Sequence, residues 1–261
     1  NEFEIPSPAP HGISINSDGS EVYVASNTAD WIYKIIPLTG EIIGSVMDVE
    51  INNPEDIETQ RLKPIQCLSI SDSLLFVTCS GGQWVDPWSG TLEEIPGEVQ
   101  LWDTNTMTKL SSYQFEWHSS PWHVISHPND NIIYIALAGD GLYPASAGVA
   151  SLTYENSEFH LNWETYSEEF EMLHGIEISD DEEYIYSSGR GDGHLHVFNA
   201  ENGLLINSIE LSPSADLVMP GGVAFFNEYE LGNLNDDELI DIFDIILLIS
   251  YILGNLEDYN Q

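Results

Sequence analysis

The sequence predicts a mainly β protein that is built from repeated small sheets and is followed by a short helical segment. Three observations support this fold class. Apolar and aromatic residues alternate with polar ones over short runs, and polar turns rich in Asn, Asp, Ser and Gly separate these runs. The same order of runs and turns recurs along the chain. At Leu231 the apolar pattern changes from period two to the period of a helix.

Four segments share one pattern, in which a β-rich run, a polar turn and a second run ending in small residues follow one another. The first segment covers residues 10–26, and its counterparts cover residues 66–79, 123–136 and 174–187. A second hairpin follows each of them, over residues 31–43, 99–110, 148–161 and 194–206. Four strands per repeat form the blade of a β-propeller, and such sheets must stack on one another to bury their faces.

The number of blades is less well defined than the repeat. A fifth opening strand is expected over residues 220–226 without the rest of its repeat, and residues 1–6 read as the outer strand of an incomplete blade. We therefore expect a propeller of four to five recognisable blades over residues 1–228. It is either a fragment of a larger ring or a compact five-blade closure.

These repeats resemble those of the YVTN family of β-propellers and, more loosely, WD40 repeats. The residues that carry the resemblance are Pro10-His11-Gly12-Ile13, Asp18-Gly19, Val22-Tyr23-Val24-Ala25-Ser26 and Leu101-Trp102-Asp103. The resemblance covers about residues 8–226. It implies the fold but no single function, because propellers serve both as binding scaffolds and as enzymes.

The charge balance limits the partners. The 261 residues include 44 Asp and Glu against 5 Lys and Arg, a formal net charge of -39. Such a surface repels nucleic acids and anionic membranes and attracts cations. It fits a salty extracellular or cell-surface environment, marine or halophilic, and the alternative is a surface adapted to one cationic partner. No apolar run reaches the ~18–20 residues of a membrane span, so we expect no membrane insertion.

The two cysteines, Cys67 and Cys79, fall in one predicted hairpin. They form either a clip between adjacent strands or two buried free thiols.

A calcium-binding loop is predicted near the C-terminus, over residues 233–244, and a short apolar helix follows over residues 245–254. Oxygen donors occupy loop positions 1, 3, 5, 9 and 12, and position 7 offers its backbone carbonyl. These ligands are Asn233, Asn235, Asp237, Leu239, Asp241 and Asp244. A hard cation such as calcium takes 6–8 oxygen ligands, which this spacing can supply. The alternative is a capped amphipathic helix with an acidic first turn.

This segment resembles one repeat of a type I dockerin over about residues 232–254. Asp244 stands at the twelfth position, as in dockerins, whereas Asn233 replaces the usual Asp and Glu238 replaces the usual Gly. The resemblance implies a protein partner such as a cohesin-like domain or a cell-surface assembly. We therefore divide the chain into a propeller (1–228), a dockerin-like module (229–256) and a tail (257–261).

Three histidines, His11, His123 and His174, stand at the openings of predicted first strands. First strands line the central channel of a propeller, so these imidazoles could meet there and bind a ligand, copper or zinc. The alternative is a structural role, in which the imidazoles hydrogen-bond to the backbone.

Aromatic residues form two further groups that could bind a glycan or a peptide. Trp84 and Trp88 lie in an insert over residues 81–97, and Trp117 and Trp122 lie near Tyr143 in a second group. The alternative is packing of each loop on its own blade. Together these features predict a non-catalytic extracellular scaffold that binds a protein or a glycan and docks through calcium. A metalloenzyme or lyase that uses the channel histidines is the alternative.

Overall fold

The computed structural model describes residues 9–27, 30–46, 62–86, 89–211 and 219–224. The chain divides into two compact units, Asn1–Val223 and Ala224–Gln261. The predicted boundary at residue 228, the calcium loop and the helix all lie outside the described residues. All strands of the described residues belong to the first unit.

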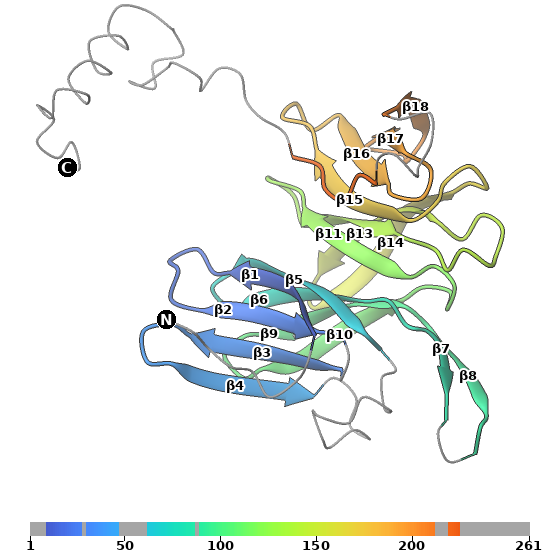
Figure 1. Cartoon of the computed structure of the whole chain (residues 1–261). Helices are drawn as coiled ribbons and strands as arrows, with labels where there is room; N and C mark the ends of the chain where they lie inside the picture. The colour runs from blue at the N-terminus through green and yellow to red at the C-terminus, as the bar shows by residue number, and fades with distance from the viewer. Residues whose placement is uncertain (1–8, 28–29, 47–61, 87–88, 212–218, 225–261) are drawn as a thin grey trace, which may run out of the picture. The chain divides into compact units, whose positions relative to one another are not determined.

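Four antiparallel sheets of four strands each dominate the first unit (Figure 1). Sheet 1 contains β1 (Pro10–Ile15), β2 (Val22–Ser26), β3 (Trp31–Ile36) and β4 (Glu41–Val46). Sheet 2 contains β5 (Pro64–Ser71), β6 (Leu74–Cys79), β9 (Glu98–Asp103) and β10 (Thr108–Gln114). Sheet 3 contains β11 (Pro121–Ser126), β12 (Ile132–Leu137), β13 (Gly148–Glu155) and β14 (Glu158–Tyr166). Sheet 4 contains β15 (Leu173–Ile178), β16 (Tyr184–Gly189), β17 (His194–Asn199) and β18 (Leu205–Glu210). The predicted mainly β fold and its four four-stranded repeats are thereby confirmed.

The insert between β6 and β9 forms a hairpin of its own, which the sequence analysis did not predict. Its strands are β7 (Gly82–Val85) and β8 (Leu92–Ile95), in which Trp84 pairs with Glu93. Each strand has only four residues, too few for a clear alternation of apolar and polar residues.

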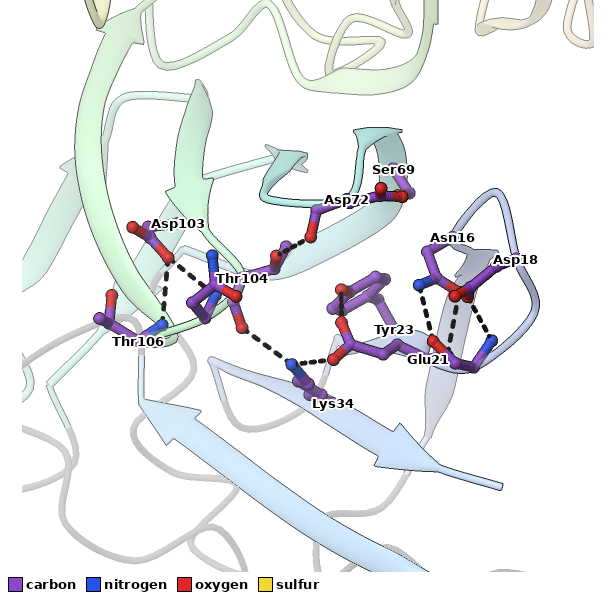
Figure 2. Close-up of polar contacts among 12 residues, drawn as sticks. Asn16, Asp18, Glu21, Tyr23, Lys34, Ser69, Asp72, Asp103, Thr104 and Thr106 are labelled. Atoms are coloured by element: carbon purple, nitrogen blue, oxygen red, sulfur yellow. Dashed lines mark hydrogen bonds and ion pairs between the residues drawn. The ribbon is translucent and has the colours of Figure 1, made fainter. Parts of the chain in front are cut away.

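The first polar turn illustrates how the sequence reverses the chain between strands (Figure 2). The Asp18 carboxylate accepts a hydrogen bond from the Ser20 N–H at 2.8 Å, and the Asn16 side-chain oxygen accepts one from the Glu21 N–H at 2.9 Å. Gly19 has φ +73°, a conformation that costs glycine little. The turn is therefore held by its own side chains.

The hydrophobic core lies between consecutive sheets. Because successive side chains on a strand alternate, β6 packs Leu75 and Val77 toward sheet 1 and Phe76 toward sheet 3. A third cluster joins Tyr134 and Val149 of sheet 3 to the apolar residues of sheet 4. The first strands are neighbours as well, with β1 beside β5, β5 beside β11 and β11 beside β15. Stacking therefore buries faces that a single sheet would leave in water.

The backbone has the same conformation at the start of each of the four sheets. The residue before its first strand has a left-handed φ of 50–54°, and these residues are Ala9, Lys63, Ser120 and Met172. A register shift then follows within the first residues of β1, β5, β11 and β15. The repeat is therefore a repeat of local backbone geometry as well as of sequence pattern.

Gly222 and Val223 lie against Gly175 of β15 in the way that Ile65 and Gln66 of β5 lie against Gly12 of β1. A Cβ atom on Gly175 would come within 2.6 Å of the Gly222 Cα, and one on Gly12 would come within 2.4 Å of the Gln66 Cα. The predicted fifth opening run begins here, although residues 219–224 carry no assigned strand.

The two cysteines are free and buried. Cys67 pairs with Val77 and Cys79 with Pro64, so the two residues are not directly opposite each other. Burial raises the pKa of both thiols. Of the two readings left open by the sequence, the structure has the buried free thiols.

A buried lysine links sheets 1 and 2 (Figure 2). The Lys34 ammonium forms an ion pair with Glu21 and donates a hydrogen bond to the Thr104 carbonyl at 3.1 Å. The Tyr23 hydroxyl donates to the same Glu21 carboxylate. Burial, and then this hydrogen bond to Glu21, raise the pKa of Tyr23. Lys34 thus holds together groups from both sheets.

Within the described part of the chain, no helix has the length and apolarity needed to span a membrane.

Candidate functional site

The three predicted channel histidines lie at the openings of first strands, His11 on β1, His123 on β11 and His174 on β15. The register of these strands makes His11 and His174 equivalent, each directly after the first strand residue. Trp122 occupies that position on β11, and His123 lies one residue further along. The histidines are therefore close in sequence pattern but not all equivalent in structure.

The three imidazoles and Trp122 nevertheless form one group, here called the inner-strand cluster (His11, Trp122, His123 and His174). The Trp122 ring centroid lies 4.6 Å from that of His174 and 5.5 Å from that of His11. The His123 and His174 centroids are 4.9 Å apart. Side chains from sheets 1, 3 and 4 thus meet, as expected for strands that line a channel.

Hydrogen bonds from this cluster connect each sheet to the next. The His11 Nδ1 lies 3.1 Å from the Ile65 carbonyl oxygen, and the His123 Nδ1 lies 2.7 Å from that of His174. The Thr78 hydroxyl donates to the Trp122 carbonyl at 2.5 Å. The three accepting carbonyls occupy the same position in sheets 2, 3 and 4, and each takes its bond from the preceding sheet. The His11 and His123 imidazoles therefore satisfy backbone carbonyls at the sheet junctions, in line with the structural alternative.

Burial favours the neutral form of two of these imidazoles, His123 and His174. Burial, and then the neighbouring His123, lower the pKa of His174 to about 4, which the Gly221 backbone offsets only in part. Burial also lowers the pKa of His123. The His174 ring nitrogens make no well-formed hydrogen bond to the described residues. Nor does any group of three or more His, Cys, Asp or Glu side chains in that part of the chain have the geometry to hold a metal ion.

A cavity of about 420 Å³ lies where sheets 2 and 3 meet. We call it the loop cavity, because its wall includes the connection from β10 to β11. Residues far apart in the sequence line it, namely Glu94, Pro96, Tyr113, Gln114, Phe115, Glu116, Trp117, His118, Ser119, Ala145, Glu164 and Tyr166.

Aromatic residues form part of the wall of the loop cavity, and Tyr143 packs against two of its lining residues. Tyr113 and Phe115 contact each other edge to face, with ring centroids 5.0 Å apart. Trp117 meets Tyr143 edge to face at 5.3 Å, and His118 stacks on Tyr143 at 4.7 Å. Phe115 is buried, whereas Trp117 is half-buried and reaches the cavity. The rings are thus fixed by one another.

Three exposed carboxylates, Glu94, Glu116 and Glu164, stand in the same wall. None of them forms an ion pair within the described residues. The four lysine and arginine residues that the structure describes, Lys34, Lys63, Lys109 and Arg190, do not line the cavity, whereas His118 does. Burial, and then the nearby Glu164 carboxylate, raise the pKa of Tyr113.

The structure divides the predicted aromatic groups. Trp117 and Tyr143 lie together, whereas Trp122 belongs to the inner-strand cluster. Trp84 lies half-buried on β7 and does not line the loop cavity, and Trp88 lies outside the described residues.

The sequence analysis did not single out the carboxylates and tyrosines of the loop cavity. Acidic residues are so common in this chain that Glu94, Glu116 and Glu164 could not be distinguished from the others. The only local signal was the alternation of Tyr113, Phe115 and Trp117, which places their side chains on one side of an extended chain.

No family model matches the chain. An uncharacterized protein from Staphylococcus saprophyticus is 24% identical over 214 residues, which are 77% of this chain and 56% of that protein. The chain therefore spans little more than half the length of this curated relative.

Solved structures show the same fold at low identity. A functionally unknown protein from Desulfotomaculum acetoxidans matches 85% of this chain and 61% of its own, with a TM-score of 0.57 and 13% identity. A protein from Lactobacillus plantarum matches 77% and 57%, with a TM-score of 0.57 and 16% identity. Hydrazine synthase from Kuenenia stuttgartiensis matches 73% and 53%, with a TM-score of 0.52 and 16% identity. With the four antiparallel sheets, these likenesses define a β-propeller-like fold. The functions of such proteins differ, so the fold does not assign one.

Proposed function

We propose that this chain is an extracellular or cell-surface binding scaffold that performs no reaction. Its stacked sheets hold the loop cavity in a fixed shape, and a protein partner or a glycan binds there. The observation that carries this proposal is the loop cavity itself, in which Trp117 and other aromatic rings stand beside three carboxylates that form no ion pair among the described residues. Aromatic side chains and a few placed polar groups are typical of binding sites.

The proposal extends to parts of the chain outside the described residues. The blades are four or five YVTN-like or WD40-like repeats, and the tail is a calcium-binding dockerin-like module that docks to a cohesin-like or cell-surface partner. Its support is the spacing of oxygen donors from Asn233 to Asp244.

A metalloenzyme or lyase is the second candidate. The observation that favours it is the inner-strand cluster, in which His11, His123 and His174 lie together with Trp122. A histidine that donates its Nδ1 proton to a carbonyl also presents Nε2 to a ligand, an arrangement common around metals.

Metal binding to the purified chain separates the two candidates. We expect calcium to bind in calorimetry, and we expect Asp237→Asn with Asp244→Asn to abolish this binding. Asp180→Asn with Asp130→Asn, which removes two carboxylates elsewhere, should leave calcium binding intact. Stoichiometric copper or zinc that disappears in His123→Ala would instead favour the enzyme. Absence of calcium binding would refute the docking module.

A further inference from the structure

We propose that the loop cavity binds an arginine side chain presented by a basic segment of a protein partner. The inference rests on the proposed binding function and names the chemistry that the site would recognise.

The carboxylates argue for a cationic ligand. Glu94 comes from β8, Glu116 from the connection between β10 and β11, and Glu164 from β14, so three separate segments direct negative charge at one cavity. Among the described residues, the Tyr166 hydroxyl donates a hydrogen bond to Glu164 at 3.3 Å, and Glu94 and Glu116 accept none through their side chains. Holding like charges together without a cation is unfavourable, and a bound cation would relieve this.

The aromatic wall favours a guanidinium over a compact ammonium. A guanidinium is planar, forms paired hydrogen bonds with carboxylates and stacks on aromatic faces, whereas an ammonium is a strongly hydrated point charge. Trp117, Tyr113 and Tyr166 all line the cavity beside the three carboxylates. A cation over such rings gains roughly 0.5–2 kcal/mol, with Trp the best partner.

A neighbouring hollow points to a peptide rather than a free small cation. It measures about 430 Å³, shares Ala145 with the loop cavity and is lined mainly by apolar groups that include Leu142, Tyr143 and Met172, with Glu168 and Glu171 also in its wall. Leu142 is 77% exposed and Met172 is 42% exposed. An acidic aromatic cavity beside an apolar one fits an arginine and an apolar side chain carried on one extended segment.

The test uses the full chain and a peptide, acetyl-Gly-Arg-Gly-Leu-Gly-amide, with Trp fluorescence or calorimetry as the readout. A second peptide carries citrulline in place of arginine and thus keeps the shape without the charge. High salt suppresses the general attraction of an acidic surface, so both titrations are run in about 0.5 M NaCl, where the Debye length falls below ~8 Å.

We expect saturable binding of the arginine peptide and at least tenfold weaker binding of the citrulline peptide. Glu116→Gln with Glu164→Gln should weaken arginine-peptide binding about tenfold or more. The matched control, Glu155→Gln with Glu158→Gln, removes the same charge from the exposed turn between β13 and β14 and should change binding less than twofold. A lysine peptide that binds as well as the arginine peptide would overturn the guanidinium assignment.

Equal weakening by the cavity pair and the control pair would show unspecific electrostatic attraction and refute the inference, as would no binding at all. The site inference can also fail while the proposed binding function stands. If the peptide binds elsewhere, arginine and citrulline peptides will still be distinguished while the cavity variants have no effect, and the scaffold role will stand without this site.

Discussion

Lys34 offers the sharpest test of how sheets 1 and 2 are joined. Lys34→Met keeps much of the side-chain volume but removes the ammonium. The Lys34 and Glu21 side chains are only 9% and 20% exposed, so solvent screens their ion pair weakly. Removing one partner of a buried pair typically costs about 3–5 kcal/mol, because the other charge stays buried. Tyr23 still donates to Glu21, which favours the lower end, about 3 kcal/mol.

For a unit of this size, Asn1–Val223, a loss of about 3 kcal/mol corresponds to a fall in Tm of about 6–12 °C. Urea unfolding followed by circular dichroism gives the free energy, and a thermal scan gives the Tm. Lys109→Met is the matched control, since Lys109 is 40% exposed and lies 3.8 Å from Glu98. Its partner Glu98 is only 3% exposed but keeps hydrogen bonds from Gln100 and Gln114, so Lys109→Met removes the same charge at a smaller cost than Lys34→Met. If the two variants were equally stable, the buried network would not contribute as reasoned.

Three further predictions concern the sheet junctions. The pKa of histidine in the unfolded chain is near 6.5 and that of native His174 is about 4, so the unfolded chain binds more protons between these two pH values. The free energy of unfolding should therefore fall by up to about 3 kcal/mol as the pH is lowered from 6.5 to 4. Urea titrations of His174→Gln should lose this part of the pH dependence. Gly12→Ala should lower the free energy of unfolding by about 1–3 kcal/mol or more, because its Cβ would lie 2.3 Å from a β5 carbonyl oxygen. Gly222→Ala, whose Cβ would have no atom within 4 Å, should leave the stability nearly unchanged. Similar melting temperatures for the two variants would contradict this. Thr78→Val should lower the free energy of unfolding by about 1–3 kcal/mol, because the Trp122 carbonyl of sheet 3 would lose its hydrogen-bond donor. Thr106→Val, at an exposed threonine, should leave the stability unchanged. Equal unfolding midpoints for the two variants would refute the hydrogen-bonding role of Thr78.

Much of the fold could be predicted from the sequence because the signals are local. Strand residues such as Val22, Tyr23 and Val24 alternate in environment, and turn residues such as Asp18 and Gly19 hold the reversals with their own side chains. Such features depend on neighbours in the chain, so all sixteen strands of the four repeats were found near their observed places. The short hairpin of β7 and β8 was missed because its strands are too brief to show a period.

The candidate site depends on the tertiary structure. Glu94, Glu116 and Glu164 are separated by long stretches of chain and line one cavity only because the β7–β8 hairpin and sheets 2 and 3 come together in the fold. In the same way, the one-residue offset of His123 from His11 and His174 follows from strand register, which no spacing in the sequence reveals.

The sequence by itself therefore determined the repeat, the strand order within it and the acidic character of the chain. Only the tertiary structure decided which few of its many carboxylates share a cavity with Trp117, and that Lys34 is buried between two sheets. The physical reason is that alternation and turn chemistry act over a few residues, whereas charge pairing and cavities arise between segments that only folding brings together.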